Sequence, residues 1–431
     1  MARGALKITF LVLTLCSGDV LCQLFQLFGA NPSRFASERY MRSRFHMAAR
    51  KLGLNSSVSE NSDALDFVAM VDEHDYPVEE HLVTTEDGYE LHVHRIPGSP
   101  DKPKAPGKPV VYFQHGLFSS SDQWILMGPE SDFSYMLADA GYDVWLGNIR
   151  GNTYSRSHVK LSPDYDGEFW NFSFHEIALF DIPATIDYIL KETQQPSLIY
   201  VGHSMGGTIS NVLLSTKPEY NEKIKLVINL ATTVTWLSPH QPTVELILHH
   251  ADSIKGALNN MKIYELLSLS AATPRMITTL CGEKSMFRQL CAIFQMESIQ
   301  SDVNMWHNWI SSFPAGTSAQ SVLHYLQNIE SGNFVMYDFG EKENSLKYGQ
   351  PEPPAYDLSN IVAPVALIYG EGDSIIAPDD VIELSKRLPN VVTIESVPDP
   401  KFGHLDFVVA QDIKKLLNNR LLEIMENSLK Q

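Results

Sequence analysis

The sequence predicts an α/β fold in which a mostly parallel central sheet is flanked by helices. Three observations predict it: short apolar runs that alternate with helical stretches, a glycine-rich turn at 202–206 directly after one of those runs, and a long interval at 235–355 with helical patterns in place of further strands. Strands that alternate with helices favour parallel pairing, because each connection returns along a face of the sheet. We expect the long interval to form a helical cap inserted between two strands.

An antiparallel hairpin opens the predicted sheet. Residues 82–85 and 90–94 are strand-like and are separated by an Asp87-Gly88 turn, a combination typical of hairpins. The other predicted strands lie near residues 110–114, 143–147, 198–201, 225–230, 364–369 and 391–395. The predicted cap helices lie at 244–254, 261–269, 287–294, 303–311 and 319–329. Residues that follow the carboxyl ends of parallel strands should meet at one edge of the sheet.

A candidate nucleophile follows the apolar run at 198–201. Residues 202–206 read Gly-His-Ser-Met-Gly and lead into a small-residue stretch that can begin a helix. This is a G-x-S-x-G motif in the strand–turn–helix context that exposes a serine on a strained turn. Glycines permit so tight a turn, and a serine hydroxyl attacks a carbonyl when a general base adjoins it. We expect Ser204 to be the nucleophile and the N–H of Met205 to be an oxyanion donor.

An acid and a histidine should follow the serine in that order. Asp373 comes just after the predicted strand at 364–369 and is the expected acid, with Glu371 as its competitor. The pair Asp379-Asp380 opens an expected helix, so we expect it to cap that helix. His404 is the expected base among the 15 histidines, because it lies in a loop after the final strand and before the last helix.

The first oxyanion donor should lie upstream of the serine. The apolar run at 110–114 leads into His115-Gly116-Leu117 and a serine-rich loop. The alternative is an ordinary turn at a strand end, which the nearby serine motif disfavours. Two preorganised backbone donors would stabilise a tetrahedral intermediate, and the loss of one typically costs about 3 kcal/mol.

Several further motifs occur in a fixed order along residues 67–425. They are TTEDGY at 84–89, QHGL at 114–117, NIRGNTYS at 148–155, FWNFSFHE at 169–176, DIPA at 181–184, PAGTS at 314–318 and GHLDF at 403–407. In these motifs the chain resembles the acid lipases, the family of lysosomal acid lipase, gastric and lingual lipases and many insect lipases. The resemblance implies an α/β-hydrolase fold and a serine lipase that acts on neutral lipid esters such as triacylglycerols.

The resemblance also assigns roles to residues. It implies Ser204 as nucleophile, Asp373 as acid, His404 as base, and the N–H groups of Leu117 and Met205 as the oxyanion hole. No metal and no organic cofactor is expected for this chemistry. The expected partners are a neutral lipid ester and the lipid droplet or emulsion interface that presents it.

Other functions remain open at this point. A sterol ester hydrolase or a short-chain carboxylesterase would use the same residues, whereas a non-catalytic lipid-binding protein of the yolk type has no need for a serine, an acid and a base. Residues 232–233 are Thr-Thr, where members of the family commonly have a Leu-Ala-Pro-Val-Ala-like run near the acyl site. The resemblance therefore predicts the reaction chemistry but not the substrate preference. Large apolar residues of the cap are expected to pack on the core, and some of them to line an acyl pocket: Met305, Trp306, Trp309, Phe313, Phe334 and Met336.

The amino terminus predicts entry to the secretory pathway. Arg3 and Lys7 precede an apolar stretch too short to span a membrane, so residues 1–22 are expected to be a signal peptide of a secreted or lysosomal protein without a transmembrane anchor. Residues 23–66 form an N-terminal segment whose basic part is either a removable pro-region or a solvated helix. The hydrolase core is expected at 67–234 and 356–431, with the cap at 235–355.

Cysteines, sequons and charge bear on possible modifications and partners. Cys281 and Cys291 could close a short disulfide loop, as the family also bridges a pair in this region, or could remain free thiols. Asn55 and Asn171 each begin an N-glycosylation sequon. The formal net charge of −18 disfavours nucleic acid and anionic membrane surfaces as partners, so adsorption to lipid would depend on apolar contact.

Overall fold

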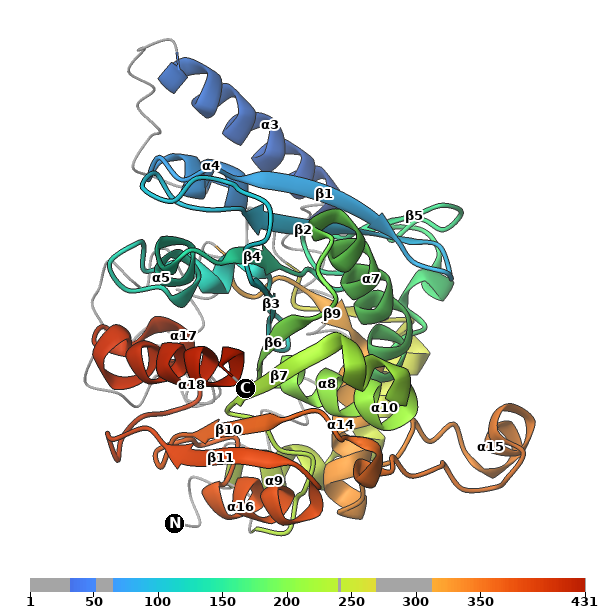
Figure 1. Cartoon of the computed structure of the whole chain (residues 1–431). Coiled ribbons are helices and arrows are strands. Elements are labelled where there is room, and N and C mark those ends of the chain that lie inside the picture. Colours follow the sequence, from blue (N-terminus) through green and yellow to red (C-terminus); the bar gives the residue numbers. More distant parts are fainter. Residues whose placement is uncertain (1–31, 52–64, 239–241, 269–311, 431) are drawn as a thin grey trace, which may run out of the picture.

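The computed structural model describes residues 32–51, 65–238, 242–268 and 312–430, which Figure 1 colours along the chain. Within them, one sheet has nine strands in the order β1-β2-β4-β3-β6-β7-β10-β11, with β5 paired to β2. The strands are β1 (Glu79–Thr84), β2 (Tyr89–Ile96), β3 (Val110–Gln114), β4 (Asp143–Leu146), β5 (Ser157–His158), β6 (Leu198–His203), β7 (Ile224–Leu230), β10 (Val365–Tyr369) and β11 (Val391–Ser396). β1 and β2 form the predicted antiparallel hairpin, and every pair from β4 to β11 is parallel.

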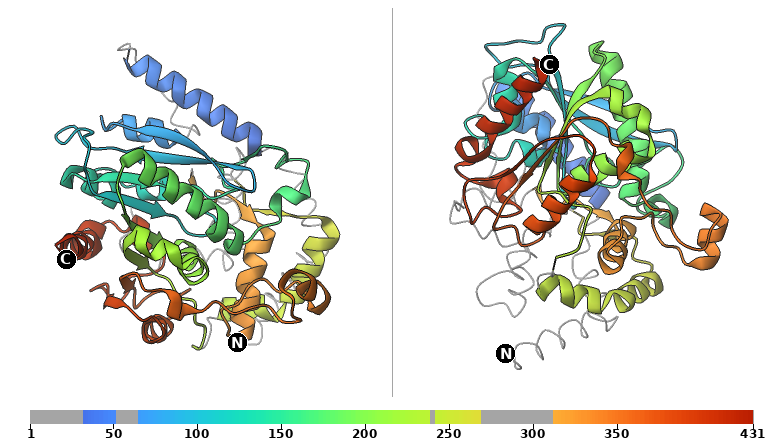
Figure 2. Two further views of the ribbon diagram at one scale, coloured as in Figure 1. Left: turned by 45° about the vertical axis from the view of Figure 1, so that its right-hand side comes forward. Right: turned by 60° about the horizontal axis from the view of Figure 1, so that its bottom comes forward.

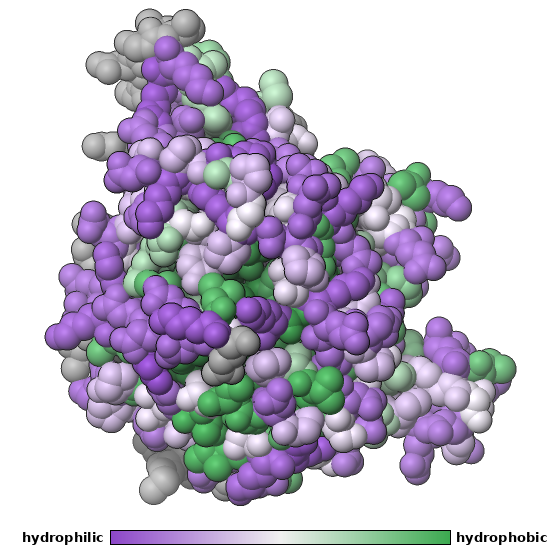
Figure 3. Space-filling view, in the orientation of Figure 1, coloured by the Kyte–Doolittle hydropathy of each residue, from purple (hydrophilic) through white to green (hydrophobic). Residues whose placement is uncertain are grey.

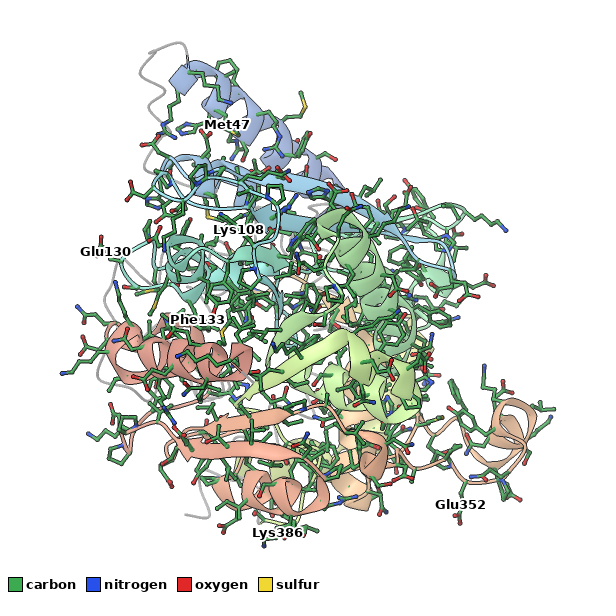
Figure 4. All side chains as sticks on the ribbon, in the orientation of Figure 1. Met47, Lys108, Glu130, Phe133, Glu352 and Lys386 are labelled. Atoms are coloured by element: carbon green, nitrogen blue, oxygen red, sulfur yellow. The ribbon has the colours of Figure 1, made fainter. Side chains whose placement is uncertain are left out.

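Helices cover both faces of this sheet (Figures 1 and 2). One face carries α7 (Ile182–Thr193), α8 (Met205–Thr216) and α16 (Pro378–Arg387), and the other carries α5 (Phe133–Ala140), α17 (Asp406–Val409) and α18 (Asn419–Leu429). The central strands are buried on both sides: in β3, Val110 and Tyr112 join the first core cluster, while Val111 and Phe113 join the second. This alternation explains why the central strands read as continuous apolar runs. Phe133, labelled in Figure 4, is buried in the second core cluster.

The described part of the cap differs from its prediction in two places. α14 (Ala319–Ser331) confirms the expected helix at 319–329. The single helix expected at 244–254 is instead α9 (Pro242–His249) followed by α10 (Ala251–Met261). The helix expected at 261–269 is wrong, because β8 (Glu265–Leu266) there pairs with β9 (Thr317–Ser318), an interaction distant in sequence that local periodicity does not encode. The helices expected at 287–294 and 303–311 lie outside the described residues.

Two further segments project from or flank this body. α15 (Glu341–Tyr348) lies on an extended arm of the predicted cap segment, on which Figure 4 labels Glu352. α3 (Pro32–Lys51) lies along the hairpin edge of the sheet beside α4 (Phe67–Asp72). α3 turns a polar face inward, because Arg39 is buried and donates to the Leu65 carbonyl and, at 3.0 Å, to Asp122 Oδ2. Its Met41 and Phe45 are 68% and 74% exposed.

The outer surface is mostly hydrophilic in the view of Figure 3, with apolar residues gathered over β10 and β11. From β11, Val392 and Ile394 are exposed. Among the helices that the structure describes, none combines the length and the apolar character that crossing a bilayer requires.

Candidate active site

Ser204 occupies the turn between β6 and α8. Its φ of 53° and ψ of −116° are unusual for a residue with a side chain, which is the strain expected of a nucleophile turn. The turn closes only with glycines on both sides. A Cβ atom on Gly202 would lie 2.6 Å from the backbone of Gly206, and one on Gly206 would lie 2.2 Å from the Gln114 carbonyl oxygen. The two glycines of the motif are therefore dictated by close backbone packing.

The structure brings the three predicted catalytic side chains together. His404 Nε2 lies 2.9 Å from Ser204 Oγ, and His404 Nδ1 lies 2.8 Å from Asp373 Oδ2. The residues come from three loops at the carboxyl ends of parallel strands: the turn after β6, the loop after β10 and the loop after β11. This arrangement lets Asp373 hold a hydrogen on Nδ1, which leaves Nε2 free to accept the serine proton.

Asp373 is better placed than its competitor Glu371. The Asp373 side chain is 1% exposed, and its second oxygen, Oδ1, accepts the backbone N–H groups of Ile375 and Ile376 at 2.8 Å each. The carboxylate is thus fixed from one side while it faces His404 with the other. Glu371 is exposed.

The capping role expected for Asp379 and Asp380 is wrong. α16 has Ala377 at its N-cap position, and neither aspartate makes a capping bond to that helix. Asp380 is buried and its Oδ1 accepts the N–H groups of Leu237 and Ser238 at 2.9 and 3.0 Å. Asp380 therefore holds the start of the predicted cap segment, through a contact distant in sequence that the helix-start pattern does not reveal.

The two backbone groups predicted for the oxyanion hole flank the serine. Met205 is the first residue of α8, so its N–H has no partner within the helix. Leu117 follows Gly116, whose Cβ position would lie 3.3 Å from Ser204 Cβ. The segment predicted as a cap packs on this loop, because Ala315 donates its N–H to the Phe118 carbonyl at 2.6 Å. The predicted cap and the predicted oxyanion loop are thus directly connected.

No role was predicted from the sequence for the side chains of two buried histidines beside the site. His203 Nε2 lies 3.1 Å from the carbonyl oxygen of His404, and the ring centroids of the two are 5.0 Å apart. Burial lowers the pKa of His203 to about 3, with a further contribution from the charge of His404, so it stays neutral. His115 is also buried, and burial lowers its pKa to about 4. Their positions within the two glycine motifs were the available signal.

The remaining predicted sites are placed in part. Asn171 is exposed, whereas Asn55, Cys281 and Cys291 lie outside the described residues, as do Met305, Trp306 and Trp309. Phe313 and Phe334 are buried against the core. In the residues that the structure describes, no group of three histidine, cysteine or acidic side chains is arranged to bind a metal ion.

Comparison with known proteins identifies the family. A model of the partial α/β-hydrolase lipase region matches residues 67–128, and a model of the α/β-hydrolase fold matches residues 109–411. Lipase 3 of Drosophila melanogaster is 38% identical over 87% of this chain and 96% of its own length. The chain belongs to the α/β-hydrolase lipases. It is accordingly a lipase-type ester hydrolase.

Other lipases of the family show the same extent of similarity. Gastric triacylglycerol lipase of Bos taurus is 36% identical over 89% of this chain and 97% of its own length. Human lipase member K is 37% identical over 82% of this chain and 89% of its own. A bacterial membrane phospholipase A structure aligns with a TM-score of 0.50 at 13% identity over the whole of both chains, which shows the shared fold alone.

Proposed function

We propose that this lipase is a secreted or lysosomal serine enzyme that hydrolyses neutral lipid esters, chiefly triacylglycerols, through an acyl-enzyme intermediate. The observation that carries the proposal is the hydrogen-bonded chain from Ser204 through His404 to Asp373 on a strained turn. A lipid-binding protein without catalysis has no use for a serine held in this backbone conformation beside a general base.

Acylation begins when Ser204 Oγ attacks the ester carbonyl carbon and His404 Nε2 takes the hydroxyl proton. The carbonyl oxygen gains the negative charge and is held by the N–H groups of Leu117 and Met205. Asp373 stabilises the imidazolium of His404. When the intermediate collapses, the bond to the alcohol oxygen breaks, and His404 gives its proton to that oxygen, so the alcohol leaves.

Deacylation repeats these steps with water. His404 takes a proton from water, the hydroxide attacks the acyl carbon, and the same two N–H groups hold the oxyanion. The bond to Ser204 Oγ then breaks, and the serine recovers its proton from His404 as the fatty acid leaves. Every proton is accounted for by one histidine, without a metal or a cofactor.

The relatives and the cap support a neutral lipid as substrate. Several similar proteins are triacylglycerol lipases by name. The cap reaches the oxyanion loop through Ala315, and its Phe313 and Phe334 add apolar bulk where it meets the core. A cap that packs at the mouth of the site can shield an acyl chain and open at a lipid interface.

The substrate class is tested with the purified protein and three substrates: emulsified triolein, cholesteryl oleate and p-nitrophenyl butyrate. We expect hydrolysis of triolein that rises when the substrate forms an emulsion and that is absent in Ser204→Ala. Preference for cholesteryl oleate would favour a sterol ester hydrolase. Turnover of the butyrate ester alone, with no interfacial rise, would show a short-chain carboxylesterase.

We also propose that residues 1–22 are removed as a signal peptide, that Cys281 and Cys291 are bridged, and that Asn55 and Asn171 carry glycans. The exposed side chain of Asn171 supports the last point. Peptide mapping of the secreted protein without reduction, with and without glycosidase, measures all three. Two alkylatable thiols in the folded protein would exclude the disulfide.

We further propose that α3 is retained in the mature protein, with the core at 67–234 and 356–431 and the cap at 235–355. Removal of α3 would leave buried Asp122 without Arg39. An uncompensated buried charge is costly, so this helix is better explained as part of the fold than as a pro-region.

A further inference from the structure

His115 is a buried polar residue next to the site, and the proposed proton transfers between Ser204, His404 and the substrate do not involve it. It follows β3 and is fully buried, and burial lowers its pKa to about 4. Its ring is therefore neutral at neutral pH, with one nitrogen that donates and one that accepts.

The neighbours of His115 decide which nitrogen carries the hydrogen. Nε2 faces two donors, Asn152 Nδ2 at 3.2 Å and the Ile149 N–H at 3.4 Å. The amide of Asn152 is itself oriented, because its Oδ1 accepts the N–H groups of Tyr154 and Ser155 at 3.1 Å each. Nε2 is thus the acceptor, and Nδ1 carries the hydrogen.

His115 Nδ1 donates this hydrogen to the Gly116 carbonyl oxygen, at 2.8 Å. That carbonyl belongs to the same peptide group as the N–H of Leu117. In a trans peptide the C=O and N–H point in opposite directions within one plane, so fixing the oxygen fixes the direction of the N–H. The same oxygen accepts the Ser119 N–H at the longer distance of 3.3 Å.

We propose that His115 is a positioning residue for the oxyanion hole: its Nδ1–H holds the Gly116–Leu117 peptide so that the Leu117 N–H faces the developing oxyanion, and Asn152 holds His115 in the required tautomer. This inference rests on the proposed function, in which Ser204 attacks and Leu117 donates. A donor fixed before the reaction stabilises the transition state without reorganisation, whereas it adds little to binding of the ester itself.

The first test compares His115→Leu, which lacks a donor, with His115→Asn, whose amide nitrogen can occupy the Nδ1 position. On p-nitrophenyl butyrate we expect His115→Leu to lower kcat about ten- to a hundredfold, because complete loss of an oxyanion donor costs about 10²–10³-fold. KM should stay within about twofold, and His115→Asn should recover much of kcat. Affinity for a trifluoromethyl ketone, which forms an oxyanion on the serine, should fall in step with kcat, while affinity for octanol should not change.

A second variant keeps the test decisive if His115→Leu does not fold. In Asn152→Asp, an oxygen replaces the amide nitrogen that donates to His115 Nε2 at 3.2 Å and to Asn148 Oδ1 at 2.8 Å. This oxygen would accept a hydrogen from Nε2, which moves the hydrogen away from Nδ1 and sets a bare nitrogen against the Gly116 oxygen. We expect the same loss of kcat and ketone affinity with unchanged circular dichroism.

Unchanged kcat and ketone affinity in the folded variants, or equal losses in His115→Leu and His115→Asn, would overturn the inference while wild-type activity leaves the proposed function intact. A wild-type protein that neither hydrolyses the ester nor binds the ketone would instead refute the proposed function.

Discussion

Replacing Asp373 by Asn should abolish most activity without unfolding the protein. Oδ1 of Asp373 accepts two backbone N–H groups, so the asparagine has to keep its carbonyl oxygen there and turn its NH₂ group towards His404 Nδ1. A donor facing Nδ1 stabilises the tautomer with the hydrogen on Nε2, which can no longer accept the Ser204 proton. In the opposite orientation, the NH₂ group of the asparagine would face the backbone N–H groups of Ile375 and Ile376, which are also donors.

The expected loss is about 10⁴-fold in kcat, the magnitude that this exchange causes in serine proteases, which corresponds to about 5.4 kcal/mol of transition-state stabilisation. The assay is kcat and KM on p-nitrophenyl butyrate, with thermal unfolding as the measure of stability. Glu371→Gln, at the exposed neighbouring acid, is the matched control and should keep near-normal activity. Asp373→Asn activity within tenfold of wild type, or a comparable loss in Glu371→Gln, would refute the assignment.

Two further predictions concern stability. Arg39→Met should lower the free energy of unfolding by about 3–5 kcal/mol, because it leaves Asp122 buried without its cation. Adding Asp122→Asn should recover part of this loss, and urea unfolding measures both variants. A loss below about 1 kcal/mol would indicate that α3 contributes little to the fold. Burial lowers the pKa of His324 to about 3, so on acidification below its ordinary value of about 6.5 the unfolded chain binds a proton that the folded protein does not. Through this residue, the free energy of unfolding should therefore fall by up to about 1.4 kcal/mol per pH unit towards pH 3. His324→Gln keeps a donor for the Val335 carbonyl and should show a shallower fall between pH 6 and 4 in the same assay. Equal slopes in wild type and variant would contradict this linkage.

The sheet could be predicted from the sequence because its signals are local. The central parallel strands are short apolar runs, because they are covered on both faces. The glycines of the 202–206 turn are imposed by backbone contacts within a few residues or with the adjacent strand. The chain order of serine, acid and histidine then placed Ser204, Asp373 and His404, which the structure brings within hydrogen-bonding distance.

The features that were missed depend on contacts distant in sequence. Glu265 lies in a strand because it pairs with Ser318 and because Arg156 binds its carboxylate, neither of which the helical periodicity at 261–269 reveals. Asp380 resembles a helix N-cap residue in sequence, but it binds the backbone of Leu237 at the start of the inserted segment 235–355. Arg39 reads as a solvated helix residue until Asp122 is placed beside it.

The central claim is that Ser204 is the catalytic nucleophile of an ester hydrolase. Titration of the purified protein with a fluorophosphonate, followed by mass mapping and assay on emulsified triolein, tests it most directly. We predict one adduct per chain on the peptide that contains Ser204, with hydrolysis lost in proportion to labelling and no labelling in Ser204→Ala. Triolein hydrolysis that persists after complete labelling, or an adduct on a different serine that accompanies the loss of activity, would contradict the claim.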